Sequence, residues 1–372
     1  MAASMLIGRS NLMQDLFAAV GGLPRQTFLN RSSSFLVGCF HMVTIAINGF
    51  GRIGRMVFRA GFLDEDFDVV AINDLTSPQE LAYLLRYDSV QGGFPGEVAW
   101  DDEHLIVDGR RIRVFAERDP VNLPWRDYNV DVVIEGTGFF TKREGAAKHL
   151  EAGAKKVLIT APGKGVDLTI VKGVNEHDYD PEQHDVVSNG SCTTNNIAPI
   201  VKVMHDNYGV EKCFFVTVHA YTSTQKLIDG PDAKDPRRGR AAALNIVPST
   251  TGAAKTVVQV IPELEGRIDG HALRIPVPVG SITDMNFVLA REVSEHEVRE
   301  LLHSVSHHHL RGVLSYSEEA LVSSDIVGSQ YSTVVDAQMT RVMGNFVKLQ
   351  AWYDNEYGYS CRCVEVAKML VE

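Results

Sequence analysis

The chain has 372 residues, of which 45% are hydrophobic and 22% are charged, and its formal net charge is −11. This length exceeds what one compact core usually holds, so two domains are expected. Because the net charge is acidic, the protein surface as a whole does not attract nucleic-acid phosphates. Any anionic ligand must therefore be held by individual basic or hydrogen-bonding side chains at its site. No segment has the ~20 consecutive apolar residues of a membrane-spanning helix.

Residues 1–41 differ in composition from the rest. They carry Arg9, Arg25 and Arg31 against one acid, Asp15, and they include three consecutive serines. Such a leader is typical of an organelle transit peptide. The alternative is an upstream start codon, because Met42 directly precedes the first expected strand. We favour the second interpretation and predict a cytoplasmic protein, with an organelle as the alternative location.

From Val43 onward, short apolar strands alternate with helices. Helical segments are expected from about residue 51 past residue 58 and from 142 to 152. The expected strands are 43–47, 68–72, 131–135 and 156–160. This alternation is typical of a parallel sheet covered on both faces, which right-handed crossovers build into a doubly wound, Rossmann-type domain.

After Cys192 the pattern changes. A helix is expected over 197–207, and a long polar stretch over 221–244 is typical of a functional loop or an interface. The later strands are longer and more alternating, at 213–219, 274–278, 284–291 and 346–353. They predict an α+β catalytic domain with a mostly antiparallel sheet. We therefore expect an NAD-binding domain over 42–191, completed by 356–372, and a catalytic domain over 192–355.

A nucleotide-binding motif follows the first strand. Gly49, Gly51 and Gly54 match G-x-G-x-x-G between a strand and a helix, which is the context that its mechanism requires. The glycines allow a tight turn, a close approach of a pyrophosphate and close packing of helix and strand, and the helix N-terminus attracts the phosphates. Asp74 ends the second strand, where a carboxylate binds the ribose 2′-hydroxyl and disfavours NADP. The cofactor predicted is NAD.

A cysteine and a histidine form the candidate chemical centre. Cys192 lies in Ser-Cys-Thr-Thr-Asn at the start of the expected helix, where the helix dipole would lower the pKa of its thiol. His219 ends an expected strand, and an imidazole next to the thiol would stabilise the thiolate as an ion pair and move protons. Either residue alone is usually structural. Their position downstream of a dinucleotide motif favours catalysis.

Other polar groups are candidates for binding phosphate. In the segment Ser249 to Lys255, hydroxyl side chains are expected to cap the start of a helix, which is a site for anions. Arg274 is expected at the start of a strand, and its guanidinium suits phosphate. Three further arginines, Arg237, Arg238 and Arg240, lie in the long loop. No metal site is predicted: consecutive His307, His308 and His309 point in different directions on a helix, and the cysteines are scattered and odd in number, which also argues against a disulfide framework. The closely spaced Cys361 and Cys363 are interpreted as packing residues.

Four sequence stretches together are highly specific: Asn48–Arg55, Ser191–Asn195, His219–Thr222 and Trp352–Gly358. Through them the chain from about Val43 to its C-terminus resembles the phosphorylating glyceraldehyde-3-phosphate dehydrogenases. The resemblance implies oxidation of D-glyceraldehyde 3-phosphate with NAD and inorganic phosphate to 1,3-bisphosphoglycerate, through a thioester on Cys192 with His219 as the base. It also implies a homotetramer, in which the 221–244 loop lines the neighbouring subunit's NAD site.

The resemblance carries over to individual residues. Cofactor-binding positions are Gly49, Gly51, Arg52, Ile53, Gly54, Asp74, Arg118, Thr137, Gly138, Thr160 and Asn355. Phosphate and substrate positions form two groups, one of Ser191, Thr193, Thr251 and Gly252, the other of Thr222, Arg238 and Arg274. Two other functions stay open: an erythrose-4-phosphate dehydrogenase, which hydrolyses its thioester, and a non-catalytic role such as RNA binding. No membrane partner is expected, and nucleic acid is disfavoured because no basic, aromatic-rich stretch is present.

Overall fold

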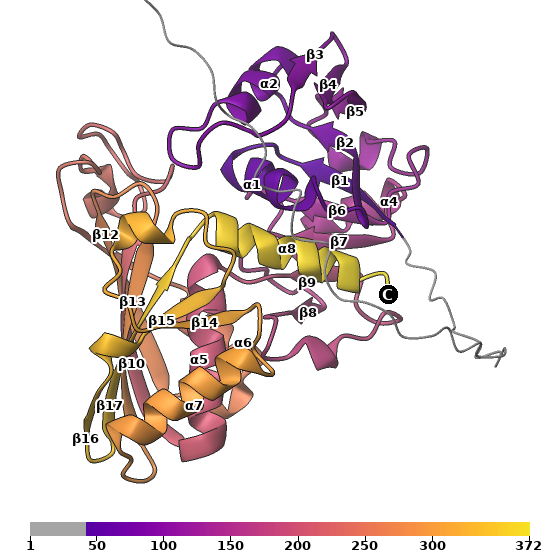
Figure 1. Cartoon of the computed structure of the whole chain (residues 1–372). Coiled ribbons are helices and arrows are strands. Elements are labelled where there is room, and N and C mark those ends of the chain that lie inside the picture. Colours follow the sequence, from indigo (N-terminus) through magenta and orange to yellow (C-terminus); the bar gives the residue numbers. More distant parts are fainter. Residues whose placement is uncertain (1–41) are drawn as a thin grey trace, which may run out of the picture. The chain divides into compact units, whose positions relative to one another are not determined.

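The computed structural model describes residues 42–372 (Figure 1). Within them, a first sheet of nine strands has the spatial order β3-β4-β5-β2-β1-β6-β7-β9-β8. The strands are β1 (Val43–Asn48), β2 (Phe67–Asn73), β3 (Val98–Trp100), β4 (His104–Val107), β5 (Arg110–Phe115), β6 (Val132–Glu135), β7 (Lys156–Ile159), β8 (Leu168–Thr169) and β9 (Val186–Ser188). All pairs are parallel except β3 with β4 and β4 with β5.

The centre of this sheet follows from its β-branched sequence. Ile45 and Ile47 are fully buried and pair with Val132 and Ile134 of β6. Strands that are apolar on both faces must be covered by helices on both sides of the sheet. The segments between the strands of this sheet contain those helices. These are α1 (Arg52–Gly61), α2 (Pro78–Arg86), α3 (Arg143–Ala146) and α4 (Lys148–Glu151), with single turns η1 (Pro120–Asn122) and η2 (Glu176–Asp178).

The second sheet has eight strands among the described residues, ordered β11-β12-β10-β13-β17-β15-β14 with β16 beside β17. Its strands are β10 (Val210–Ala220), β11 (Val247–Thr250), β12 (Ile268–Ile275), β13 (Ser281–Leu289), β14 (Leu314–Ser317), β15 (Thr333–Asp336), β16 (Arg341–Met343) and β17 (Phe346–Tyr353). Two pairs are parallel, β10 with β12 and β14 with β15, and the others are antiparallel. The predicted fold class is confirmed.

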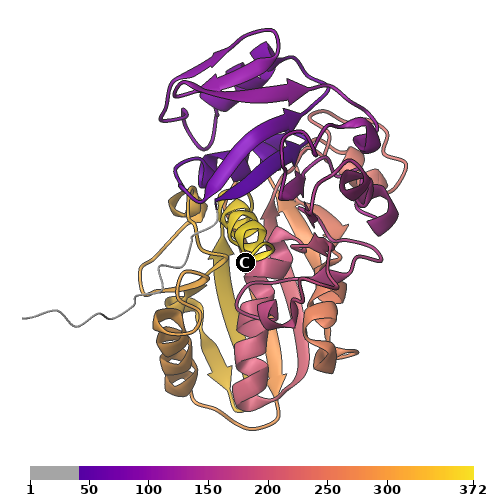
Figure 2. The same cartoon turned by 90° about the vertical axis from the view of Figure 1, so that its right-hand side faces the viewer.

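Helices cover one face of the second sheet. They are α5 (Cys192–Tyr208), α6 (Ala253–Val260) and α7 (Glu295–His307), and the chain also makes short turns η3 (Pro236–Gly239), η4 (Pro262–Leu264), η5 (Ser323–Ile326) and η6 (Ala337–Met339). Figure 2 shows α5 lying along the strands. The alternation of β13 is regular, with residues such as Met285 and Phe287 buried under these helices. On other strands of this sheet, Phe214 and Phe346 stay partly exposed.

The last helix returns to the first sheet. Helix α8 (Tyr357–Met369) packs against α1, and Cys363 and Val366 join the core that contains Ile45 and Ile47. The interpretation of Cys363 as a packing residue is confirmed, because its side chain is fully buried. Helix α8 thus adds to the core of the first sheet, although β17, which precedes it, belongs to the second sheet.

Several sequence expectations need correction. Arg274 does not open a strand: β12 begins at Ile268, and Arg274 is its penultimate residue. The helix expected over 197–207 begins at Cys192 itself, and the one expected over 142–152 is two short helices. The strands β3 to β5 and β14 to β16 were not expected, because most of them have only three or four residues, which carry too little periodicity to be recognised, and β5 has six. Over residues 42–372, no helix has both the length and the apolar character needed to cross a membrane. The 1–41 leader lies outside the described residues.

Candidate active site

Cys192 is the first residue of α5. The helix is capped by Ser191, whose Oγ accepts the Thr194 backbone N–H at 3.1 Å. The Asn195 side chain donates to the carbonyls of Asn189 and Ser191, at 2.8 and 3.0 Å, and so holds the turn before the helix. Cap and turn together fix where the thiol stands relative to the helix axis.

His219 lies near the end of β10, and its Nε2 is 3.5 Å from the Cys192 Sγ. The ring is buried and stands edge-on against Tyr353, with ring centroids 5.8 Å apart. The two residues predicted as nucleophile and base are therefore brought together, although one comes from a helix start and the other from a strand end.

Arg274 reaches His219 because β10 and β12 pair in parallel with these two residues opposite each other. Its guanidinium Nη1 is 2.5 Å from His219 Nδ1 and 3.2 Å from the Ala220 carbonyl oxygen. The same carbonyl lies 2.7 Å from Nδ1. A guanidinium only donates, so Nδ1 accepts from Arg274 in one tautomer and donates to Ala220 in the other.

The protonation of His219 follows from these surroundings. Burial and then the Arg274 charge lower the pKa of His219 to about 3. The ring is therefore neutral near pH 7, which is the form that accepts a proton. In the Nδ1–H tautomer, both His219 Nδ1 and Arg274 donate to the Ala220 carbonyl, and Nε2 is free to accept the proton of the Cys192 thiol.

The thiol does not have the lowered pKa that the helix N-terminus suggested. Burial raises the pKa of Cys192 above its ordinary value, and the Arg274 charge opposes that rise. The expectation is corrected for a simple reason: an ionised sulfur loses more hydration in this cavity than nearby charges return. The resting pair is then a thiol beside a neutral imidazole, with the base placed to take the proton.

Tyr353 was missed by the sequence analysis. Its hydroxyl is within hydrogen-bonding distance of Thr193 Oγ1 at 3.1 Å and Thr217 Oγ1 at 2.7 Å, and burial raises its pKa. It ties the first turn of α5 to β10 and so keeps Cys192 and His219 in register. Two signals in the sequence point to it: its place in the specific stretch Trp352–Gly358, and the alternation of β17, which puts it on the covered face.

The two predicted groups of phosphate-binding residues differ in how the fold brings their members together. Burial lowers the pKa of Arg274, and the charge of Arg238 adds a smaller lowering. Thr222 lines the cavity that contains Cys192 and His219. In the other group, Ser191 lines that cavity as well, whereas Thr251 and Gly252 precede α6, which packs beside α5.

A cavity of about 600 Å³ lies at the carboxyl ends of β1, β2, β5 and β6. Asp74 lines it and accepts the backbone N–H groups of Phe50 and Thr76, at 2.8 and 3.0 Å. Other predicted cofactor residues in its lining are Gly49, Gly51, Arg118 and Thr137. This is the position where a doubly wound sheet binds the adenosine half of a dinucleotide.

The glycines test whether this site fits NAD. Gly49 has φ +91°, and a Cβ there would lie 2.8 Å from Thr137; a Cβ on Gly54 would lie 2.1 Å from the Gly49 carbonyl oxygen. Glycine is therefore required at position 49 by the turn and at position 54 by the close packing. A Cβ on Gly51 would meet no atom within 4 Å. The open space lies in front of the α1 N-terminus, where a pyrophosphate needs it.

A second cavity, of about 480 Å³, includes Cys192 and His219. The predicted cofactor residues Arg52, Ile53, Thr160 and Asn355 line it. Asn355 Oδ1 accepts the Ser281 hydroxyl at 3.0 Å, which orients its amide. Arg52 forms ion pairs with Asp88 and Glu356, which the sequence did not indicate. Gly54 and Gly138 line neither cavity; Gly138 has φ +73° and serves the turn after β6.

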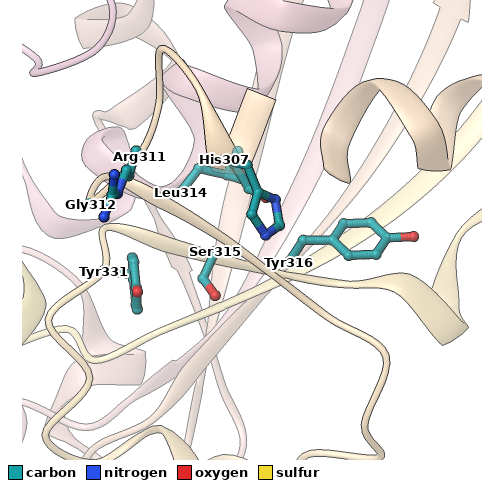
Figure 3. Close-up of a pocket in the computed structure, with 8 residues that line it drawn as sticks. His307, Arg311, Gly312, Leu314, Ser315, Tyr316 and Tyr331 are labelled. Carbon is teal, nitrogen blue, oxygen red and sulfur yellow. The ribbon is translucent and has the colours of Figure 1, made fainter. Parts of the chain in front are cut away.

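A third cavity lies away from this centre, at the C-terminal end of α7. Figure 3 shows His307 and Tyr316 on one side of it and Arg311 with Tyr331 on the other. The His307 Nδ1 is 2.9 Å from the His303 carbonyl, and the ring is exposed. Within residues 42–372, no cluster of three or more His, Cys, Asp or Glu side chains could hold a metal ion.

The first sheet is mostly parallel and carries a glycine turn, and a cysteine and a histidine line a cavity beside that turn's helix. This combination defines a class of protein. The chain is an NAD-dependent oxidoreductase.

Comparison with known proteins identifies the family. Residues 43–143 match the NAD-binding domain of glyceraldehyde 3-phosphate dehydrogenase, and residues 191–355 match its C-terminal domain. The glyceraldehyde-3-phosphate dehydrogenase of Kitasatospora aureofaciens is 53% identical over 88% of this chain and 99% of its own length. That of Geobacillus stearothermophilus is 53% identical over 87% and 97%, and glyceraldehyde-3-phosphate dehydrogenase 1 of Bacillus subtilis is 52% identical over 89% and 98%. The chain belongs to the glyceraldehyde-3-phosphate dehydrogenase family.

Proposed function

We propose that the chain is a phosphorylating glyceraldehyde-3-phosphate dehydrogenase of glycolysis and gluconeogenesis. It oxidises D-glyceraldehyde 3-phosphate with NAD and inorganic phosphate and releases 1,3-bisphosphoglycerate. The observation that carries the proposal is the 3.5 Å approach of Cys192 Sγ to His219 Nε2 in the cavity that Asn355 also lines. A neutral imidazole beside a thiol, at the nicotinamide end of a dinucleotide site, suits oxidation of an aldehyde through a covalent thioester.

The residues of the pair act in sequence. The Cys192 sulfur attacks the aldehyde carbon while its proton passes through His219 to the aldehyde oxygen, giving a hemithioacetal. His219 Nε2 then takes the hydroxyl proton as the carbon loses hydride, and a thioester remains on Cys192. Bound NAD supplies the hydride acceptor. Inorganic phosphate attacks the thioester carbon, the C–S bond breaks, and the sulfur recovers a proton from His219.

The two phosphate groups are assigned to two clusters. Arg274, Arg238 and Thr222 hold the phosphate of the substrate, because two neighbouring guanidiniums suit a dianion. Ser191, Thr193, Thr251 and Gly252 hold the inorganic phosphate, near the N-termini of α5 and α6. The lining of the two cavities supports the cofactor positions Arg52, Ile53, Asp74, Arg118, Thr137, Thr160 and Asn355.

A homotetramer is proposed from the surface of the long loop. Leu227, Ile228 and Leu244 are all at least 77% exposed in the single chain. Apolar side chains gathered in one segment usually mark a protein interface. Light scattering coupled to gel filtration should give four times the chain mass, and a monomer at micromolar concentration would contradict this proposal.

Domain boundaries and location remain proposals of the same kind. We place the NAD-binding domain at 42–191 with 356–372 and the catalytic domain at 192–355, in agreement with the two sheets and with α8. We propose a cytoplasmic protein, with organelle import as the alternative. Fusing residues 1–41 to a fluorescent protein separates the two, since only a transit peptide would carry the reporter into an organelle.

The deciding experiment measures NADH formation from glyceraldehyde 3-phosphate and NAD, with and without inorganic phosphate. A rate that requires phosphate is expected. A rate indifferent to phosphate would contradict the proposal and favour a dehydrogenase that hydrolyses its thioester. Erythrose 4-phosphate in the same assay gives the matched substrate control.

A further inference from the structure

A buried polar network lies beneath the cavity that holds Asp74, and the proposed chemistry does not use it. Glu135, the last residue of β6, is 1% exposed, and His149 of α4 is fully buried. Asn48 ends β1 and is buried as well. A carboxylate is retained in such a place only when hydrogen bonds replace its lost hydration.

Trp125 determines the tautomer of His149. The indole Nε1–H can only donate, and it lies 2.9 Å from His149 Nδ1, so Nδ1 is the acceptor. The proton of the neutral ring is then on Nε2, which donates to Glu135 Oε2 at 3.2 Å. Asn48 Nδ2 donates to the same oxygen at 2.5 Å. Its 3.3 Å approach to His149 Nε2 is therefore a contact between two donors that share one acceptor.

The other carboxylate oxygen holds the loop after β6. Oε1 accepts the Thr137 backbone N–H at 2.9 Å and also the Thr137 hydroxyl. The hydroxyl oxygen in turn accepts the Phe139 N–H at 3.0 Å. Four donors thus converge on Glu135, which matches the acceptor capacity of an ionised carboxylate.

The network continues to two further loops of the cavity. Asn48 Oδ1 accepts from Asn73 Nδ2 at 2.7 Å. Asn73 also donates to the Glu117 carbonyl at 2.9 Å and accepts the Glu117 N–H at 2.8 Å. Thr137, Asn48, Asn73 and the Glu117–Arg118 segment all line the same cavity. One buried carboxylate is therefore linked to three of its walls.

We propose that Glu135 and His149 are positioning residues that set the separation of these walls for the adenosine half of NAD. The inference rests on the proposed function, since it concerns the cofactor site of that enzyme. Glutamine at position 135 would present an amide NH₂ to Thr137 or to Asn48, where an acceptor is needed. The loop that meets the donor would then shift, and the cavity would lose its fit to the adenosine ribose.

Glu135→Gln tests the proposal when ligand binding is measured by calorimetry with NAD and with AMP, which carries only the adenosine half. Both affinities should fall by about tenfold, the effect of one buried group left unpaired. Alkylation of Cys192 by iodoacetamide in the absence of ligand should keep its rate, and kcat at saturating NAD should change by less than about twofold. A general loss of structure would instead lower both affinities and kcat together, and it would change the alkylation rate because the buried thiol would become exposed.

Asn175→Ala is the matched control. Asn175 is equally buried in the same domain, where it accepts the Val171 N–H at 2.9 Å and donates to the Thr169 carbonyl at 2.9 Å, and it lines neither cavity. It should lose thermal stability and keep its affinity for AMP. If Glu135→Gln does not fold, Trp125→Phe removes the indole donor together with part of a buried ring, and it should weaken AMP binding by about threefold.

A folded Glu135→Gln protein, or Trp125→Phe in its place, that binds AMP as tightly as the wild type would overturn the inference. Equal weakening in Asn175→Ala would overturn it too, because any buried defect would then have the same effect. Wild-type protein that binds neither NAD nor AMP would instead remove the proposed function, and this inference with it.

Discussion

The two cavities that we propose as the dinucleotide site are built in different ways. The cavity around Asp74 belongs to one parallel sheet, and its walls are strand-end loops held by backbone hydrogen bonds and a buried carboxylate. The cavity around Cys192 draws on both sheets and on α1, α5 and the turn before α8. The first site depends on backbone shape, whereas the second depends on the relative placement of charged and titratable side chains. Substitutions should therefore affect binding in the first and rate in the second.

The largest expected effect tests the second cavity at its nucleophile. Cys192→Ser should lower the rate of NADH formation by about 10⁴-fold or more, because a serine hydroxyl beside a neutral imidazole is a far weaker nucleophile than sulfur. Affinity for NAD, measured by titration, should stay within about twofold. Substantial turnover by this variant would show that the nucleophile is elsewhere.

The next effect concerns the base. His219→Gln keeps a side chain of similar reach but cannot accept the thiol proton, and kcat should fall by about 10²- to 10⁴-fold. The rate at which iodoacetamide alkylates Cys192 should fall with it. His177→Gln, a change on an exposed residue, is the control and should leave both rates unchanged. An unchanged alkylation rate in His219→Gln would indicate that the thiol ionises without the imidazole.

Two glycines of one motif sharpen the contrast between folding and binding in the first cavity. In Gly54→Ala the new methyl would lie 2.1 Å from the Gly49 carbonyl oxygen, so the free energy of unfolding should fall by about 1–3 kcal/mol. In Gly51→Ala the methyl meets no protein atom within 4 Å. Stability should then be kept, while NAD affinity falls by about tenfold because the methyl occupies the space of the pyrophosphate.

Chemical denaturation and NAD titration of both variants measure the two quantities side by side. Loss of stability in Gly51→Ala, or tight NAD binding by it, would contradict the division of roles between these glycines.

The smallest effect is on the pH dependence of stability. The pKa of His219 is about 3 in the folded chain, lowered from the ordinary histidine value of 6.5 that applies when the chain is unfolded. Between these values the unfolded chain binds the proton and the folded chain does not, so the free energy of unfolding rises with pH, by at most ~1.4 kcal/mol per pH unit for this group. Urea denaturation at several pH values should give a smaller slope for His219→Gln. Equal slopes would mean that the ring is protonated in the folded protein.

The sequence alone determined the parts that are local. The strand, the glycine turn and Asp74 lie within about thirty residues, and each follows from its own chemistry: small residues at a turn, a carboxylate at a strand end, a cap before a helix. Cys192 could be placed at a helix start in the same way, and the four motif stretches identified the family. The alternation of strands and helices predicted the type of both sheets, one parallel and one mostly antiparallel, but not their short strands.

Only the tertiary structure decided the relations between distant segments. Arg274 contacts His219 because two strands pair in a particular register, and no property of residue 274 itself reveals that register. Burial, which is a property of the whole fold, raises the pKa of Cys192 where the local helix start suggested the opposite. Tyr353 and the network of Glu135 with His149 join residues from separate elements. Local motifs are specified by short stretches of chain, whereas electrostatics and positioning depend on which segments the folded core brings together.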